Sequence, residues 1–521
     1  MSTIERPLVL AFDCGTQSTR ALLFDKQGNI IGKHKIEFTP YYSLKPGWAE
    51  QRADIYYEKM CEASLALKSK FPEDWKDIIA ISVTTIRDTA VCLDKDGKPL
   101  RDVIVWLDQR TADCKDQFSR SRKAIFSLVG MLEAVEIQAG QGKCNWIRQN
   151  EPEIWAKTDK YVMLSAYINL KLSGRLVDSV ASQIGHIPFD YKNKRWLSKN
   201  DLKSCMFFVD DNQRCDLINP GELMGNITAK AASETGIAEG TPIIASGSDK
   251  GCETLGTGCV GDGIASLSFG TTATIQMTID RYVEPQTFMP AYPAVLPNAY
   301  NDEVQIYRGF WMITWFKEQF AAKEVEQAKR LNTSPEKLLD ERLKDIPAGS
   351  DGLVLQPYWS PTLKSPEARG AIIGFSDIHT RAHLYRAIIE GIGYGLVGGM
   401  KIMEKRLKYN IRKITVSGGG SSSDAVCQIT SDMFGLPVYR VQTYETSGLG
   451  AAMTAFVGMG EFKSFEEAIE RMVHYGDCFT PDMTDHEVYM DIYNKVYSKI
   501  YKKLRPMYRN IKEIIKHKEE L

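Results

Sequence analysis

The sequence predicts an α/β protein built from two domains. A chain of 521 residues exceeds the size at which a single hydrophobic core keeps growing, so two large domains are expected. The chain opens with strand patterns followed by a helix and another strand, and a second strand-turn-strand pattern of the same kind occurs past its middle. We place the two domains at residues 1–255 and 256–521.

The first domain begins with three predicted strands. The runs "LVLAFD", "RALLFD" and "IIGKHKIEF" form a meander, and "KQGN" makes its second turn. A helix is expected over residues 53–70 and a strand over 78–85, "IIAISVTT". The region from Arg110 to about Lys203 is mostly helical, interrupted by "LSGRLVDSVASQIGHIPFD". This order of elements is typical of an α/β domain.

The turn "GTQST" between the first two strands allows two interpretations. It is either a plain hairpin, since clusters of Gly, Thr and Ser are ordinary turn signals, or a phosphate-binding turn. In the second case the backbone N–H groups and hydroxyls of Thr16, Gln17 and Ser18 converge on an anion, while Asp13 holds a cation that shares its charge.

The stretch from Thr241 to Ile279 predicts a strand, a loop, a short helix and another strand, and the domain boundary is expected here. Within it, "SFGTT" repeats the opening pattern, with Gly270, Thr271 and Thr272 as the turn. No sequence identity links the two hairpins. Two such hairpins, one per domain, could grip a polyphosphate from both sides of a cleft.

A third turn follows in "RKITVSGGGSSSDAVCQITSDMFG", which predicts a strand, a glycine turn and a helix with Ser422 or Ser423 as its N-cap. A helix amino terminus after such a turn suits nucleotide binding, and the alternative is a simple strand-to-helix connection. The consecutive glycines Gly418, Gly419 and Gly420 indicate that something comes close to the backbone.

The composition sets limits on partners and location. The net charge is -1 with no long block of one sign, which argues against nucleic acid as a partner. The eleven cysteines are scattered singly, which favours reduced thiols. The start has no signal-peptide pattern and no apolar run reaches membrane-spanning length, so a cytoplasmic enzyme without membrane contact is expected. The helical pattern over residues 491–521 packs on its own body or on a partner, so a homodimer is one interpretation.

The chain resembles the FGGY carbohydrate kinases over nearly its whole length. The resemblance rests on motifs that occur in the correct order: "DCGTQSTRA", "IVWLDQRT", "GKCNWIRQNEPEIW", "SGSDKG", "SFGTT", "GAIIGFSDIHTRAHLYRAIIEG" and "SGGGSSSD". It implies two actin-like (ribonuclease H-like) α/β domains closing over a central cleft. The first domain would carry the sugar site and the catalytic base, and the second would bind the nucleotide.

The resemblance assigns catalysis to Asp249, which ends a strand and precedes a helix, so that its carboxylate can act as a base. A helix N-cap is the alternative role for this aspartate. Asp13 would assist through Mg²⁺, by way of water. The residues expected to contact ATP are Thr16, Gln17, Ser18, Gly270, Thr271, Thr272, Gly418, Gly419, Gly420 and Ser423.

Arg87 and Asp88 fall where glycerol kinases carry an Arg-Glu pair that binds substrate hydroxyls, and Trp106 resembles the family tryptophan that packs on the carbon chain. Asp108 and Arg110 belong either to this substrate site or to a local ion pair.

Two substrate positions depart from the glycerol kinases. Gln138 replaces an expected tyrosine, and Lys250 replaces the glutamine that follows the catalytic aspartate. Lys250 is either a surface charge or a contact to a hydroxyl, carbonyl or carboxylate oxygen of the substrate. The pocket is therefore expected to differ from that of a plain glycerol kinase.

The sequence as a whole predicts ATP-dependent phosphorylation of a hydroxyl group of a small sugar or polyol, of the ketopentose or polyol type. The alternative is a catalytically weak, actin-like ATP-binding protein with a regulatory role. The presence of both Asp13 and Asp249 favours the enzyme, because a regulatory ATPase needs no base beside a sugar pocket.

Overall fold

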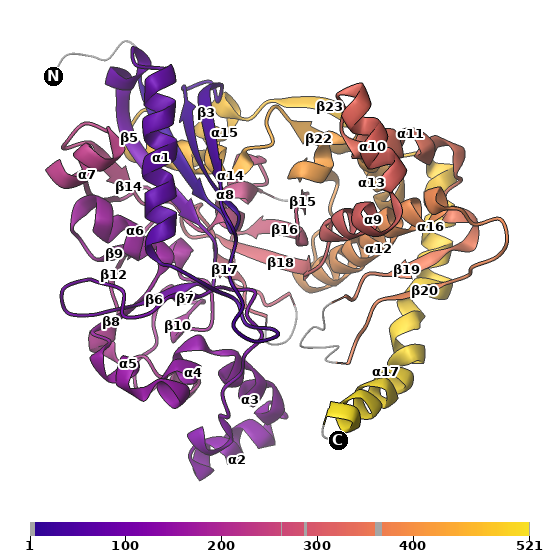
Figure 1. The fold of residues 1–521 in the computed structure, drawn as a ribbon, viewed down its shortest axis with the longest axis horizontal. Coiled ribbons are helices and arrows are strands. Elements are labelled where there is room, and N and C mark those ends of the chain that lie inside the picture. Colours follow the sequence, from indigo (N-terminus) through magenta and orange to yellow (C-terminus); the bar gives the residue numbers. More distant parts are fainter. Residues whose placement is uncertain (1–5, 262, 286–288, 360–366, 520–521) are drawn as a thin grey trace.

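Two mixed β-sheets, one in each half of the chain, form the framework of the computed structural model (Figure 1). The structure describes residues 6–261, 263–285, 289–359 and 367–519. The expected boundary between residues 255 and 256 falls at the end of helix α8 (Asp249–Gly256), and it stays a prediction.

The first sheet has the strand order β13-β14-β5-β1-β2-β3. Its strands are β1 (Leu8–Cys14), β2 (Ser18–Phe24), β3 (Ile30–Glu37), β5 (Ile78–Thr85), β13 (Leu223–Asn226) and β14 (Pro242–Ile244). β1, β2 and β3 are antiparallel, β5 and β14 run parallel to β1, and β13 closes the edge antiparallel to β14. The predicted meander and the strand over residues 78–85 are confirmed.

The second sheet has the order β17-β18-β16-β15-β21-β22-β23. Its strands are β15 (Ile264–Phe269), β16 (Ala273–Ile279), β17 (Tyr292–Pro293), β18 (Tyr300–Ile306), β21 (Lys413–Ser417), β22 (Val438–Val441) and β23 (Tyr475–Phe479). The part from β18 to β23 repeats the first sheet strand by strand: an antiparallel meander, two parallel strands and an antiparallel edge. The likeness of the two hairpins in the sequence thus reflects a repeated topology.

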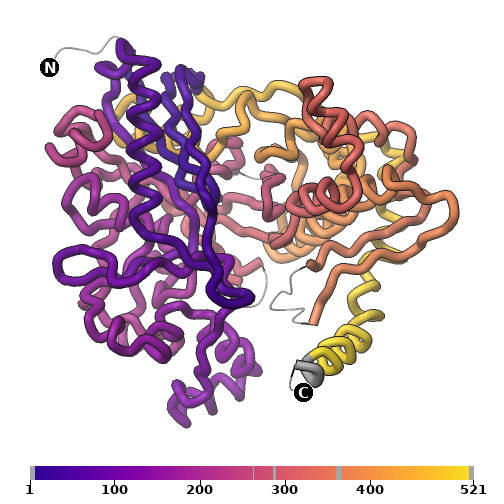
Figure 2. Tube along the Cα trace, in the orientation of Figure 1, coloured from indigo at the N-terminus to yellow at the C-terminus, as the bar shows by residue number. Residues whose placement is uncertain are grey.

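Helices and short strand pairs complete the fold, and Figure 2 traces the chain through both halves. The remaining helices of the first half are α1 (Asp54–Lys70), α2 (Arg120–Leu128), α3 (Leu132–Gln141), α4 (Lys143–Asn150), α5 (Pro152–Lys157), α6 (Leu164–Ser173) and α7 (Ala229–Thr235). The helices of the second half are α9 (Trp311–Phe320), α10 (Ala322–Leu331), α11 (Pro335–Glu341), α12 (Arg381–Leu407), α13 (Asp424–Phe434), α14 (Thr446–Gly458), α15 (Phe465–Met472), α16 (Met483–Ile492) and α17 (Ser498–Glu519). The short pairs are β4 (Glu50–Gln51) with β7 (Val103–Ile104), β6 (Ala90–Leu93) with β8 (Lys160–Met163), β9 (Val177–Ser179) with β12 (Asp216–Ile218), β10 (Phe189–Asp190) with β11 (Arg195–Trp196), and β19 (Val354–Gln356) with β20 (Ala371–Ile373).

The first sheet is buried on both faces. Leu8 and Leu10 of β1 belong to the core that includes α1, whereas Val9 and Ala11 belong to the core that includes α14. This explains why β1 is a continuous apolar run rather than an alternating one. Helix α14 comes from the second half of the chain, yet it contacts β1 and β5 of the first sheet.

Helix α8 crosses α14 at very short range. A Cβ atom on Gly256 would lie 2.0 Å from the carbonyl oxygen of Thr446, and a Cβ on Gly450 would lie 2.0 Å from that of Cys252. Only glycine permits this approach of two backbones. The crossing fixes α8, and with it the position of Asp249 in its first turn.

The carboxy-terminal helix α17 packs partly on its own body, since Tyr508 donates a hydrogen bond to Gln356. Met507 and Ile514 on the same helix remain exposed, so a homodimer through this surface stays a prediction. Among the residues that the structure describes, no helix combines the length and apolar character needed to span a membrane.

Asp302 of β18 is a buried carboxylic acid for which the described residues supply no hydrogen-bond partner. Burial raises its pKa to about 8. The folded protein therefore keeps this proton over a pH range in which the unfolded chain, with a pKa of about 3.9, loses it. The contribution of Asp302 to stability therefore falls as the pH rises from about 4 to about 8, by up to about 1.4 kcal/mol per pH unit.

Asp302→Asn should remove this pH dependence, because an amide resembles the neutral acid but does not ionise. We expect a higher melting temperature at pH 8 and little change at pH 4, measured by thermal unfolding across that range. The exposed Asp116→Asn serves as the control. A gain of equal size at every pH would contradict the assignment.

Candidate active site

A cleft of about 1390 Å³ collects many of the residues singled out in the sequence. Those that line it are Thr16, Arg87, Asp88, Trp106, Asp108, Arg110, Gln138, Asp249, Lys250 and Thr272. Its walls come from both halves of the chain, since Tyr292 and Tyr307 also line it. The predicted residues outside this lining are Asp13, Gln17, Ser18, Gly270, Thr271, Gly418, Gly419, Gly420 and Ser423.

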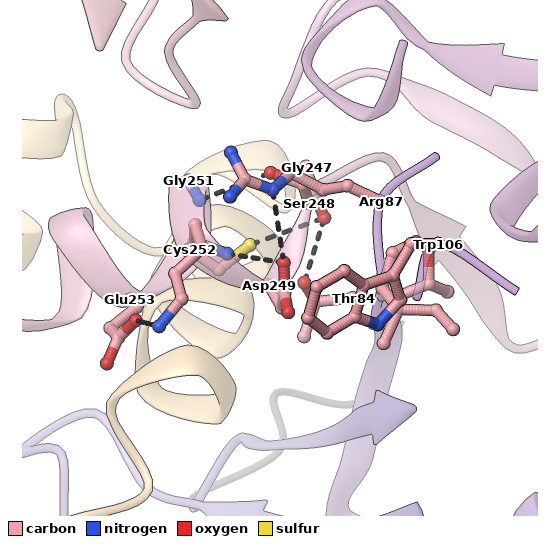
Figure 3. A network of polar contacts seen from close by, with 12 residues as sticks. Thr84, Arg87, Trp106, Gly247, Ser248, Asp249, Gly251, Cys252 and Glu253 are labelled. Atoms are coloured by element: carbon pink, nitrogen blue, oxygen red, sulfur yellow. Dashed lines mark hydrogen bonds and ion pairs between the residues drawn. The ribbon is translucent and has the colours of Figure 1, made fainter. Parts of the chain in front are cut away.

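Asp249 is the first residue of α8, and the N-cap of that helix is Ser248, whose hydroxyl accepts a hydrogen bond from the backbone N–H of Gly251. The N-cap interpretation of Asp249 is therefore wrong. Its side chain keeps 28% of its surface exposed, and Oδ1 lies 3.9 Å from Nε of Arg87 (Figure 3). Burial raises the pKa of Asp249, and Arg87 opposes that rise. The result is an accessible carboxylate beside a permanent cation.

Arg87 joins the two halves next to Asp249. Its guanidinium, at the end of β5, donates two hydrogen bonds to Glu303 of β18, at 3.0 and 3.1 Å, and lies over the ring of Tyr292. Glu303 is buried and also accepts a hydrogen bond from Gln276. Because Glu303 holds both terminal nitrogens, Arg87 faces Asp249 with its remaining nitrogen, Nε.

Asp88 forms a charged cluster on the cleft wall. It accepts a hydrogen bond from the backbone N–H of His186, contacts Nδ1 of that ring at 2.8 Å, and lies 3.5 Å from Nζ of Lys143. Burial would raise the pKa of Asp88, but His186 and Lys143 hold it well below its usual range. A Cβ at Gly185 would lie 2.5 Å from Oδ1 of Asp88, so only glycine fits there.

Trp106 connects this wall to the first hairpin. Its indole Nε1 donates a 3.0 Å hydrogen bond to the hydroxyl of Thr16. The side chain expected to contact the carbon chain of a sugar is thus held by the turn expected to contact phosphate.

Asp13 pairs across the first hairpin with Arg20, whose Nη1 lies 2.6 Å from its Oδ2. Burial raises the pKa of Asp13 to about 6, Arg20 opposes the rise, and the charge of Asp249 adds to it. Asp13 offers one carboxylate to a divalent cation, since carboxylate oxygen is the preferred ligand of Mg²⁺ and a cation would relieve the repulsion from Asp249. Among the described residues no cluster of three or more metal-ligating side chains is present, so water and phosphate oxygens would have to supply the other ligands.

The second hairpin lies against the glycine turn. A Cβ at Gly418, which has φ of +80°, would lie 2.9 Å from the backbone of Phe269, and a Cβ at Gly420 would lie 2.5 Å from the ring of Phe310. Two of the three glycines are thus required by packing within the protein, and Gly419 alone has open space beside it. Ser423 is the N-cap of α13 and accepts a hydrogen bond from Val426, which confirms that prediction for the helix start.

Lys250 is not a surface charge. Its side chain is 18% exposed, and Nζ donates hydrogen bonds of 2.6 Å to Oε2 of Glu253 and to the hydroxyl of Ser268. Burial would lower its pKa, but Glu253 and then Asp249 raise it, so the ammonium stays charged.

Asp108 and Arg110 form a structural ion pair. Nη2 of Arg110 lies 2.7 Å from Oδ2 of Asp108, and Nη1 donates a 2.6 Å hydrogen bond to Oε1 of Glu50. The guanidinium also lies over the rings of Trp48 and Trp146. Both side chains are almost fully buried, which supports the local interpretation.

Comparison with known proteins identifies the family. The model for the N-terminal domain of the FGGY family of carbohydrate kinases matches residues 8–256, and the model for its C-terminal domain matches residues 265–459. The chain belongs to the FGGY family of carbohydrate kinases. The protein is accordingly a phosphotransferase with an alcohol group as acceptor.

The kinase has relatives that match it over most of its length. An uncharacterised sugar kinase of Escherichia coli is 27% identical over 479 residues, which cover 92% of this chain and 90% of the relative. A xylulose kinase of Lactococcus lactis is 26% identical over 518 residues, 97% of each chain. The crystal structure of a xylulose kinase from Lactobacillus acidophilus superposes with a TM-score of 0.82 at 21% identity, covering 97% of this chain and 100% of that one. The predicted fold of two actin-like domains is confirmed.

Two residues of the kinase site, His186 and Glu303, were not found from the sequence. His186 lies in the irregular stretch that interrupts the helical region, and Glu303 lies in the strand "YNDEVQI". The acidic residues in the middle of this strand were the available signal for Glu303. A charge that is buried in a sheet needs a partner, so such residues indicate an ion pair or a site nearby. His186 carried no comparable signal, since its partner Asp88 is distant in the sequence.

Asp88→Asn should weaken sugar binding while leaving the fold intact, because asparagine tolerates the positive φ of 48° at this position. Loss of the charge leaves Lys143 and His186 without their carboxylate, so we expect the KM for the sugar to rise about 10- to 100-fold. The KM for ATP should change little. Steady-state kinetics with Asp116→Asn as the control check this, and a rise in the KM for ATP alone would contradict it.

Proposed function

We propose that the protein transfers the γ-phosphoryl group of ATP to a hydroxyl group of a small sugar or polyol, of the ketopentose or polyol type. The observation that supports this most directly is the exposed carboxylate of Asp249 in the cleft, with the Asp88 cluster and Trp106 also in its lining. A residue from each hairpin, Thr16 and Thr272, lines the same cleft.

In the proposed reaction Asp249 accepts the proton of the substrate hydroxyl. A bond forms between that oxygen and the γ-phosphorus, and the bond to the β–γ bridging oxygen breaks with its electron pair leaving on ADP. Arg87 opposes the rise that burial imposes on the pKa of Asp249, which favours the ionised form of the base. Because Arg87 is itself held by Glu303, its position is fixed before the substrate arrives.

The sugar would lie against Asp88, Lys143 and His186, whose charged and polar groups can bind several hydroxyls, with Trp106 beside its carbon chain. Gln138 lines the same cleft and offers both a donor and an acceptor. This set of groups suits a polyhydroxylated substrate better than an apolar alcohol.

The nucleotide phosphates would lie between the hairpins, with Gly419 and the amino terminus of α13 nearby as backbone donors. Asp13 would hold Mg²⁺ through water, and the ion would spread the charge of the phosphates. All eleven cysteines are free thiols, which supports our proposal of a reducing compartment such as the cytoplasm.

A panel of candidate acceptors tests the function. We expect ADP to be released from ATP only when an acceptor is added, and the panel should include glycerol, tetritols, ketopentoses and sugar acids. ATP consumption that is independent of every acceptor would favour the regulatory ATP-binding alternative.

Asp249→Asn should remove the base while retaining nucleotide binding. Loss of a general base costs about 10²- to 10⁴-fold in rate, so we expect kcat to fall by that factor while the dissociation constant of ADP stays the same. Single-turnover kinetics and calorimetry measure the two quantities. Turnover within a few-fold of the parent would exclude Asp249 as the base.

Thr271→Val tests the nucleotide side separately from the sugar side. Loss of a hydroxyl that bonds to phosphate costs about 1.5 to 3 kcal/mol, so the KM for ATP should rise and the KM for the sugar should not. Thr16→Val is the informative partner variant. It also releases the indole of Trp106, and should therefore raise both KM values. If Thr271→Val raised only the KM for the sugar, the second hairpin would not bind ATP.

A further inference from the structure

The ion pair between Lys250 and Glu253 lies at the ends of two parallel strands. Ser268 of β15 and Ser417 of β21 are opposite one another in the register of the sheet. Nζ of Lys250 donates to the hydroxyl of Ser268, and Glu253 accepts a 2.6 Å hydrogen bond from the hydroxyl of Ser417. Ligands of α/β proteins bind at the carboxyl ends of parallel strands.

Each of these serines lies at or next to the end of a strand that leads into a turn that we assign to the nucleotide. Ser268 is followed by Phe269 and the hairpin of Gly270, Thr271 and Thr272, and Ser417 is followed by the three glycines 418–420. Lys250 and Glu253 therefore tie the starts of both turns to α8, the helix that begins with Asp249.

The ammonium group is directed away from the sugar wall. In Figure 3, Glu253 and Trp106 lie on opposite sides of Asp249. Since Nζ of Lys250 is bonded to Glu253, it lies on the side of the base opposite to Trp106. This position favours the nucleotide side over the contact with the sugar that the sequence suggested for Lys250.

Lys250 still has binding capacity where it lies. An ammonium group has three N–H donors, and Glu253 and Ser268 use two of them. The side chain lines the cleft and remains 18% exposed. One donor is thus available to a ligand without breaking either existing bond.

We propose that Lys250 donates this remaining hydrogen bond to an oxygen of the phosphoryl group that is transferred. This inference rests on the proposed kinase function, and it makes Lys250 a catalytic residue of the nucleotide side. The lysine adjoins the base in the sequence and is bonded to Ser268, near the end of the strand that leads into the second hairpin. We therefore place it where the charge of the γ-phosphoryl group develops as the bond to ADP breaks. Glu253 and Ser268 position the ammonium beforehand.

Nucleotide binding without any sugar provides the main test. For Lys250→Met we expect the affinity for the ATP analogue AMP-PNP with Mg²⁺ to fall about tenfold or more, and that for ADP to fall much less, because ADP lacks the γ-phosphate. Lys59→Met is the matched control. Its Nζ also lies 2.6 Å from a glutamate three residues on, Glu62, but on the surface of α1. Isothermal titration calorimetry measures both affinities for the full chain.

The inference is overturned if Lys250→Met leaves the affinity for AMP-PNP unchanged, or if it lowers both affinities equally, as a purely structural ion pair would. If the parent protein binds neither AMP-PNP nor ADP, the proposed kinase function and this inference both fail. Lys250→Gln is measured in parallel, and thermal unfolding shows whether each variant is folded.

Kinetics with the best acceptor of the panel add a second readout. Lys250→Met should lower kcat and raise the KM for ATP while leaving the KM for the acceptor unchanged. A rise in the KM for the acceptor alone would assign Lys250 to the sugar site and overturn the proposal.

Discussion

The contact between α8 and α14 is the constraint on which the active site depends. Gly256 and Gly450 let the two backbones meet at a distance that any side chain would prevent. Helix α14 in turn packs on β1 and β5, so the first turn of α8 is held near Asp13 of β1 and near Arg87, which follows β5.

The two sheets share a topology but differ in what covers them. The face of the second sheet toward α8 is polar: Ser266 bonds Thr257, Gln276 bonds Thr254, and Ser417 bonds Glu253. Its opposite face, with Leu267 and Ile275, belongs to a large apolar core. The first sheet is apolar on both faces, so the repeat has diverged in burial. The polar face is what allows charged residues such as Glu253 and Glu303 to be buried beside the cleft.

Much of this could be predicted from local sequence patterns. The meander, helix α1, both hairpins and the helix after the glycine turn follow from periodicity and turn residues, because these signals act between near neighbours in the chain. The position of Asp249 followed from the family motif "SGSDKG". The packing of α14 on the first sheet could not be foreseen, since an apolar helix carries no mark of which sheet it will cover. For the same reason, the partners of Arg87 and Lys250 became visible only in three dimensions: Glu303 is distant in the chain, and a lysine side chain can turn in several directions.

The hydrogen bond from Trp106 to Thr16 joins the wall of the cleft to the first hairpin. Suppose that a phosphate on the hairpin strengthens or weakens this bond. The indole then presents a different surface to a sugar that lies beside it. The affinity for ATP and the affinity for the sugar are then no longer independent. Thermodynamic reciprocity requires that each ligand alter the affinity of the other by the same factor. A hydrogen bond of 3.0 Å would in this way contribute to the cooperativity between the two substrates of the enzyme.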